Sequence, residues 1–171
     1  MLNQVENKNC TVRGILLNYE ELLNIAESKN IKIHEGYDLS GTRIKGLYCD
    51  GNIALSKDLH TEAEKKCVLA EELGHYETAV GDITDQTLTA NRKQELRGRL
   101  MAYNKMVGLL GFVQAYQHHC HNLHDMAEYL EVTDAFLSDT IDCYRAKYGS
   151  YAKIDNYLIC FEPTIGVLEL I

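Results

Sequence analysis

Three side chains close together in the sequence could act jointly on a metal ion and a water molecule: Glu71, Glu72 and His75. On a helix, residues four apart lie about 40° apart on one face, so Glu71 and His75 could bind the same ion. Glu72 lies about 100° further round, close enough to take a proton from a water molecule at that ion. This is the spacing of the zinc motif H-E-x-x-H, with glutamate in place of the first histidine. The pattern predicts metal-assisted hydrolysis.

A helix is predicted around these residues by its starting signal and its apolar content. Thr61, followed three residues later by Glu64, forms a capping box, and Gly81 is expected to end the helix. Four apolar residues accompany the acids: Val68, Leu69, Ala70 and Leu73. Acids beside apolar residues favour a cleft over an open, solvated surface.

A catalytic zinc site needs a third protein ligand and one open position. Glu95 is the first choice, since it stands 20 residues after His75 on the next predicted helix, which could run antiparallel to the first. It is also the one acid among five basic residues in 91–105. Asp82 and Asp85, near the end of the first helix, remain alternatives.

Two other segments could suggest metal binding and DNA binding, but their composition disfavours both functions. Among the histidines at 118, 119, 121 and 124, the spacing of His121 and His124 would allow a metal-binding pair, but histidines in a loop and at a helix start are expected to be solvated. Residues 122–148 resemble a helix-turn-helix, with Thr133 as the N-cap of the second helix and Gly149 as its stop. That second helix carries three aspartates, which makes a poor surface for the DNA major groove.

The composition sets the broad class of the protein. The 171 residues carry a net charge of −8, which disfavours direct nucleic-acid binding and fits a basic partner, or none. No apolar run is long enough to span a bilayer, and the polar N-terminus lacks the apolar core of a secretory signal, so a cytoplasmic protein is expected. Six cysteines without a C-x-x-C pair are expected to be free thiols.

The remaining pattern predicts an α+β fold in one domain, 18–171, after an N-terminal extension, 1–17. Asp50-Gly51 between two short apolar runs predicts a hairpin. Helices are expected at 19–28, from about 61 to 80, from about 92 to 110 after a polar loop at 82–91, and as a helical pair at 122–148. Strands are expected at 31–34, 44–49, 53–55, 157–161 and 165–170. A helix-turn-helix-like segment, 112–149, would thus precede a C-terminal β-hairpin within 150–171.

Several of these segments together resemble the ImmA/IrrE family of metallopeptidases. The resemblance is carried by LAEELGHYETAVGDITDQ followed by RKQELRGRLMAYNKMVG, and continues through CHNLHDMAEYLEVTDAFLSDTIDCYRAKYG into YLICFEP. The resemblance covers roughly residues 18–171. Within the family, the sequence is most similar to the small form found in prophages and mobile elements. The resemblance implies a zincin-like fold and an endopeptidase that cleaves a helix-turn-helix repressor.

The resemblance also implies roles for individual residues. Glu72 matches the catalytic glutamate, His75 a histidine ligand and Glu95 the downstream glutamate ligand, while Glu71 stands where the first histidine ligand is usual. One imidazole and two carboxylates form a harder, more oxygen-rich site, which should hold Zn²⁺ less tightly and tolerate Mn²⁺ better. Tyr76 and Tyr103 are candidates to stabilise the oxyanion. The alternative is a degenerate, non-catalytic protease fold that acts by binding a repressor.

Overall fold

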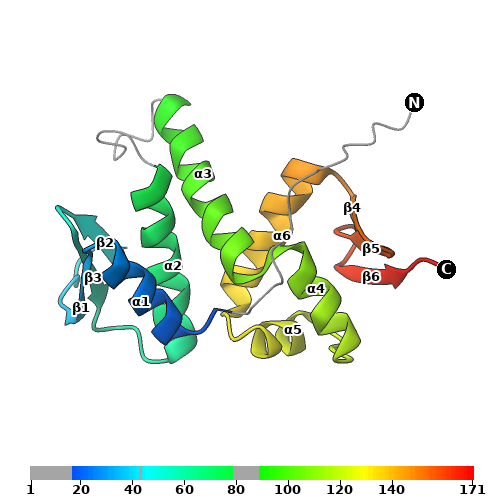
Figure 1. The fold of residues 1–171 in the computed structure, drawn as a ribbon, viewed down its shortest axis with the longest axis horizontal. Helices are drawn as coiled ribbons and strands as arrows, with labels where there is room; N and C mark the ends of the chain where they lie inside the picture. The colour runs from blue at the N-terminus through cyan, green and yellow to red at the C-terminus, as the bar shows by residue number, and fades with distance from the viewer. Residues whose placement is uncertain (1–16, 43, 79–88) are drawn as a thin grey trace.

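The computed structural model describes residues 17–42, 44–78 and 89–171, and these confirm an α+β fold (Figure 1). The helices are α1 Tyr19–Ser28, α2 Glu62–Thr78, α3 Thr89–Met106, α4 Gly108–Gln117, α5 Leu123–Tyr129 and α6 Asp134–Tyr148. The strands are β1 Lys32–Tyr37, β2 Gly46–Cys49, β3 Asn52–Ser56, β4 Tyr151–Ile154, β5 Tyr157–Cys160 and β6 Gly166–Glu169. Within the described ranges, no helix has the length and apolar character needed to cross a membrane.

The N-terminal sheet has the strand order β1-β3-β2, with β1 parallel and β2 antiparallel to the central strand β3. The predicted hairpin is confirmed: Asp50 and Gly51 both have positive φ, 44° and 75°, as a tight turn between right-twisted strands requires. This sheet packs against α2, which lies between it and α3 (Figure 1).

Helix α2 begins at the predicted capping box. The backbone N–H of Glu64 donates to Oγ1 of Thr61 at 3.1 Å, and Oε2 of Glu64 accepts from the backbone N–H of Thr61 at 2.9 Å. Its buried residues run from Lys66 to Ala70 and resume at Leu73 and Gly74. Val68 packs at Gly46 of β2, and Gly74 packs at Gly98 of α3. Helix α2 therefore contacts the sheet on one side and α3 on another.

The third helix differs from its prediction at both ends. It begins at Thr89, inside the segment predicted to be a polar loop, and ends at Met106, where a single helix to about residue 110 was expected. Gly108 has φ +58°, a left-handed conformation that glycine adopts easily, and it separates α3 from α4. The predicted stop at Gly81 and the alternative ligands Asp82 and Asp85 lie outside the described residues.

The C-terminal region is a three-stranded antiparallel sheet of order β4-β5-β6, so the predicted two-stranded hairpin was incomplete. The missed strand, Tyr151–Ile154, is only four residues long, and only Ala152 in it is fully buried. It turns into β5 through Asp155, which has a positive φ of 49°. A strand this short carries too little alternation for its sequence to indicate it.

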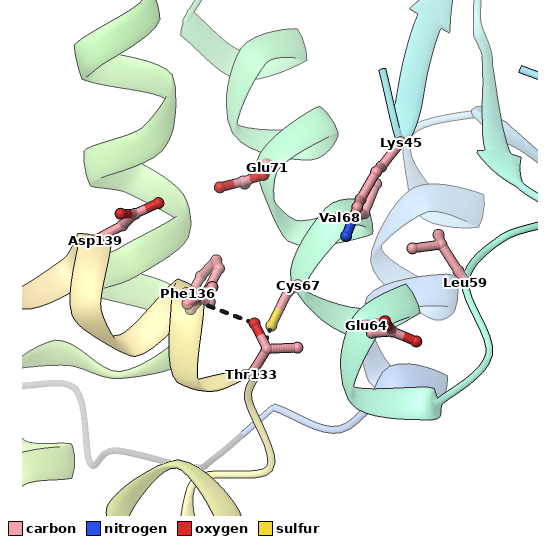
Figure 2. Close-up of a pocket in the computed structure, with 10 residues that line it drawn as sticks. Lys45, Leu59, Glu64, Cys67, Val68, Glu71, Thr133, Phe136 and Asp139 are labelled. Carbon is pink, nitrogen blue, oxygen red and sulfur yellow. Dashed lines mark hydrogen bonds between the residues drawn. The ribbon is translucent and has the colours of Figure 1, made fainter. Parts of the chain in front are cut away.

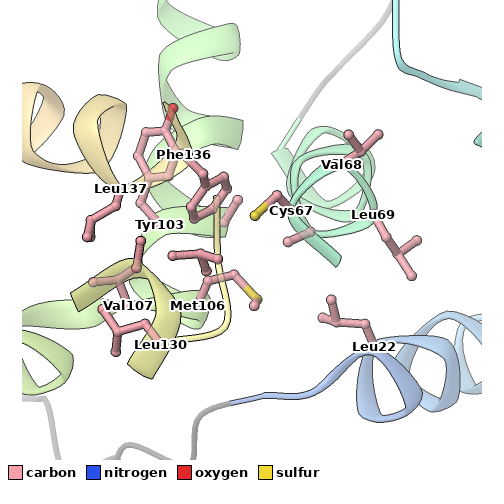
Figure 3. Packing of buried hydrophobic residues seen from close by; sticks show 14 of the residues in the cluster. Leu22, Cys67, Val68, Leu69, Tyr103, Met106, Val107, Leu130, Phe136 and Leu137 are labelled. Carbon is pink, nitrogen blue, oxygen red and sulfur yellow. The ribbon is translucent and has the colours of Figure 1, made fainter. Parts of the chain in front are cut away.

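One apolar core connects the central helices. Leu22 of α1 and Leu69 of α2 meet on one side, while Tyr103 and Met106 of α3 pack with residues of α5 and α6 on the other (Figure 3). The helices α5 and α6, predicted as a helix-turn-helix-like pair, thus contribute directly to this core. Thr133 caps α6 as predicted, by accepting from the backbone N–H of Phe136, and Gly149 follows its end with φ +81°.

Candidate active site

The site forms where α2 and α3 cross at very short distance. A Cβ atom added to Gly74 of α2 would lie 2.3 Å from the backbone oxygen of Gly98 on α3, far closer than atoms can pack. Only glycine allows the two backbones to approach so closely. As a result, Nδ1 of His75 lies 3.5 Å from Oε2 of Glu95. The structure therefore brings together His75 and Glu95, the pair that the sequence assigned to one ion.

Glu71, one turn before His75, is half-buried beside the same pair. Burial raises the pKa of Glu71 to about 7, and the positive charge of Arg99 only partly offsets this. The negative charges of Asp139 and Glu95 raise that pKa further. The negative charges around Glu71 therefore favour either protonation of its carboxylate or binding of a cation to it.

Glu72 points toward the N-terminal sheet. The backbone N–H of Tyr48 in β2 lowers the pKa of the Glu72 carboxyl group and so favours the ionised form. A Cβ atom at Gly46 would lie 2.6 Å from Cγ1 of Val68 and 2.8 Å from Oε1 of Glu72, so the start of β2 packs closely against these two side chains. Burial, followed by the charge of Glu71, raises the pKa of Glu72 to about 7. A carboxyl group with this pKa can accept and release a proton near neutral pH.

The donor set suits a divalent metal. Nδ1 of His75 is buried and has no hydrogen-bond partner among the residues that the structure describes; the nearest carboxylate oxygen, Oε2 of Glu95, lies 3.5 Å away. Burial also lowers the pKa of His75, which favours the neutral imidazole that binds metals. In the described part of the chain, however, no three His, Cys, Asp or Glu side chains converge as a complete metal-binding group. The observed geometry is a pair, His75 and Glu95, with Glu71 nearby.

Two further residues, which were not identified as site residues from the sequence, lie close to Glu71 and Glu95. Arg99 donates from Nε to Oε1 of Glu95 at 2.8 Å and so orients that carboxylate. Its i,i+4 spacing from Glu95 could have indicated this pair. Asp139 of α6 influences both Glu71 and Tyr103. No local pattern could have indicated Asp139, because it reaches the site from a distant helix.

The two candidate tyrosines are now distinguishable by position. The Tyr103 side chain is buried, and the charge of Glu71 helps burial to raise the pKa of its hydroxyl. Tyr76 is 37% exposed, and its ring packs 5.3 Å from that of Tyr48, with Lys29 over it. Tyr103, rather than Tyr76, shares the surroundings of Glu71.

A pocket of about 140 Å³ opens beside Glu71 (Figure 2). Leu59, Val68 and Phe136 give it apolar walls, and it extends from α2 to the first half of α6. The α6 side is fixed to α2 by a hydrogen bond from the backbone N–H of Thr133 to Sγ of Cys67, at 3.5 Å. The helix-turn-helix-like segment therefore forms one wall of the site.

An α+β fold in which a central helix presents two glutamates and a histidine beside a glutamate of the next helix has the layout of a metal-dependent peptidase. The model of the peptidase M78 family, described as the IrrE N-terminal-like domain, matches residues 13–141. This is most of the chain, and the protein belongs to that family. The match ends within α6, so the C-terminal sheet lies beyond it. Searches of curated proteins and of solved structures return no match.

Proposed function

We propose that this protein is a zinc-dependent endopeptidase of zincin type, and that it cleaves a helix-turn-helix repressor. The observation that carries the proposal is the pairing of His75 with Glu95 at a helix crossing that only glycines permit. Glu71 and Glu72 stand beside that pair with pKa values near 7. Perturbed acids clustered in a cleft are typical of catalytic sites. Family membership supports the same reading.

Three side chains would hold the metal: Glu71, His75 and Glu95. A zinc ion bound there would supply Lewis acidity, polarising the substrate carbonyl and acidifying water. Two carboxylates and one imidazole form an oxygen-rich donor set, so manganese is the expected substitute. Arg99 would keep Glu95 oriented through its 2.8 Å hydrogen bond.

The chain's own residues would move the protons. Glu72, whose pKa lies near 7, would take a proton from the attacking water and later give it to the leaving amine. The Tyr103 hydroxyl, whose pKa is influenced by Glu71, would stabilise developing negative charge on the substrate oxygen. Burial of these groups strengthens each of their electrostatic interactions.

The proposed substrate follows from charge and from the family resemblance. The chain carries a net charge of −8, and repressors that bind DNA are commonly basic, so the two are complementary. Cleavage of such a repressor would turn on the genes of a prophage or mobile element. The activity is proposed to take place in the cytoplasm, where such repressors act.

Elemental analysis combined with a cleavage assay tests this function. Wild-type protein, prepared without a metal-binding tag, should contain about one equivalent of zinc or manganese, and His75→Ala and Glu95→Gln should lose it. Glu72→Gln should keep the metal but no longer cut candidate helix-turn-helix repressors. Glu62→Gln, in the exposed first turn of the same helix, is the matched control and should behave as wild type.

Two outcomes would contradict the proposal. Cleavage by Glu72→Gln at the wild-type rate would remove Glu72 from the mechanism. A wild-type protein that binds no metal, even after zinc or manganese is added, would instead indicate a non-catalytic module that acts on a repressor by binding.

A further inference from the structure

The pocket beside Glu71 has the size of one long side chain. Its volume is about 140 Å³, close to that of an apolar cavity that accepts a six-membered ring of six heavy atoms. It lies between Glu71 of α2 and the first half of α6, where Phe136 and Asp139 line it (Figure 2). A side chain adjacent to a bond held at Glu71 would be able to enter it.

The walls of the pocket combine apolar and acidic groups. Leu59, Val68 and Phe136 line it with hydrocarbon, which suits the methylene stem of a long side chain. Glu64 and Asp139 add carboxylates at its edge, and Lys45 is the one cation among the residues that line it. Apart from Glu71, a proposed metal ligand, the lining thus carries two negative charges and one positive charge.

The two edge carboxylates are not equally available. Oε2 of Glu64 already accepts hydrogen bonds from the backbone N–H groups of His60 and Thr61, at 2.8 and 2.9 Å, as part of the helix cap. Asp139 is exposed, and no hydrogen bond or ion pair joins its side chain to another residue in the part of the chain that the structure describes. Asp139 is therefore the carboxylate free to meet a ligand's charge.

We infer that this pocket selects a lysine or arginine side chain of the substrate beside the bond to be cut, and that Asp139 is the residue that determines this specificity. The inference rests on the proposed peptidase function and refines its substrate class. The stem of a lysine or arginine side chain would pack between Leu59, Val68 and Phe136, and its charged end would pair with Asp139. An apolar or acidic side chain could not make both contacts. A basic DNA-binding protein offers many such side chains.

A degenerate peptide library tests this specificity. Wild-type protein loaded with zinc or manganese is incubated with the library, and the new ends are identified by mass spectrometry. Lysine and arginine should be enriched at one fixed position beside the cut. Asp139→Asn should lower this enrichment about fivefold, as expected for an ion pair at an exposed position, and Asp139→Lys should shift the preference to acidic residues.

Asp134→Asn is the matched control. Asp134 lies on the same helix, but its carboxylate pairs with Nδ1 of His124 at 3.1 Å and does not line the pocket. This variant should keep the wild-type preference. Cleavage without any basic preference, or a preference that Asp139→Asn leaves unchanged, would overturn the pocket assignment while leaving the peptidase function intact.

A binding measurement separates this inference from failure of the peptidase function. Two fluorescent peptides, identical except for lysine or norleucine at one position, are added to Glu72→Gln protein, and polarisation is followed. The lysine peptide should bind several-fold more tightly, and Asp139→Asn introduced in the same background should abolish the difference. Equal binding of the two peptides, or binding of neither, would overturn the inference whether or not the protein cuts the library.

Discussion

A Cβ atom on Gly98 would lie 2.6 Å from Nδ1 of His75, so the histidine ring occupies the space that a side chain at this position would need. Gly98→Ala should displace the ring or separate α2 from α3. The expected cost is about 1–3 kcal/mol of unfolding free energy, as for other overpacked sites, together with a large loss of zinc affinity. Chemical denaturation and a zinc titration measure the two effects.

Gly166→Ala is the control for this change. A Cβ atom at Gly166 meets nothing within 4 Å, so stability and zinc affinity should stay at wild-type values. If Gly98→Ala is as stable as wild type and binds zinc equally well, the close packing of α3 on His75 does not exist in solution.

Arg99 should affect metal binding without touching the metal. Its Nε donates to Oε1 of Glu95 at 2.8 Å, leaving Oε2 of that carboxylate toward His75. Arg99→Met should lower zinc affinity roughly 10- to 100-fold, the usual effect of removing a group that orients a ligand. Competition with a fluorescent zinc chelator gives the affinity. Arg97→Met, an exposed neighbour, should leave it unchanged, and equal affinities for both variants would refute the orienting role.

An ion-pair cluster at Glu77 should make stability depend on pH. Burial opposes ionisation of Glu77, but the hydrogen bond from Lys105 at 2.7 Å and the ion pair with Lys29 at 3.3 Å lower its pKa below 4.5 overall. A lowered folded-state pKa stabilises the protein above the unfolded-state pKa, and this stabilisation is lost as pH falls through the folded-state value.

Glu77→Gln should therefore cost about 1 kcal/mol at pH 7, and wild type and variant should converge as the pH falls through the lowered pKa of Glu77. Urea denaturation at a series of pH values measures the difference. Glu27→Gln, at an exposed position of α1, should show no such convergence. A constant difference across the whole pH range would mean that the Glu77 charge is not the cause.

Lys66 should be needed for stability because its ammonium group is buried. Its Nζ donates to the backbone oxygen of Leu130 at 3.2 Å and to Oε2 of Glu131 at 3.3 Å. Lys66→Met would leave the Leu130 oxygen without that donor, at a cost of about 1–3 kcal/mol. Lys65→Met, whose partner Glu35 is largely solvated, should cost less than about 1 kcal/mol. Thermal denaturation compares the two, and equal losses would contradict the role of burial.

The elements with strong local signals were predictable from the sequence. The capping box at Thr61 and Glu64, the turn at Asp50-Gly51 and the N-cap at Thr133 each depend on neighbouring residues, and all three are present in the structure. Helical periodicity likewise places Glu71 and His75 on one face. The break at Gly108 was harder to predict, since glycine inside a helical pattern often only weakens the helix.

The tertiary part of the site could be predicted only in outline. The sequence suggested that Glu95 would approach His75, but the distance depends on the contact between Gly74 and Gly98, which no single segment reveals. Asp139 was missed altogether, because no local sequence pattern connects its helix with the helix that carries Glu71. Metal ligation by Glu71, His75 and Glu95 stays a prediction until metal content is measured.

The attachment of α6 to α2 has a consequence for how this protein could change during evolution or in the laboratory. The bonds from Lys66 to Leu130 and from Thr133 to Cys67 join the wall of the pocket to the helix that carries the acids. An exchange of residues 122–148 between two relatives would transfer the pocket wall together with Leu130 and Thr133, the residues that bond it to α2. The shape and charge of the pocket should therefore be inherited together with this segment, whereas deletion of the segment should unfold the protein, because α5 and α6 belong to its core.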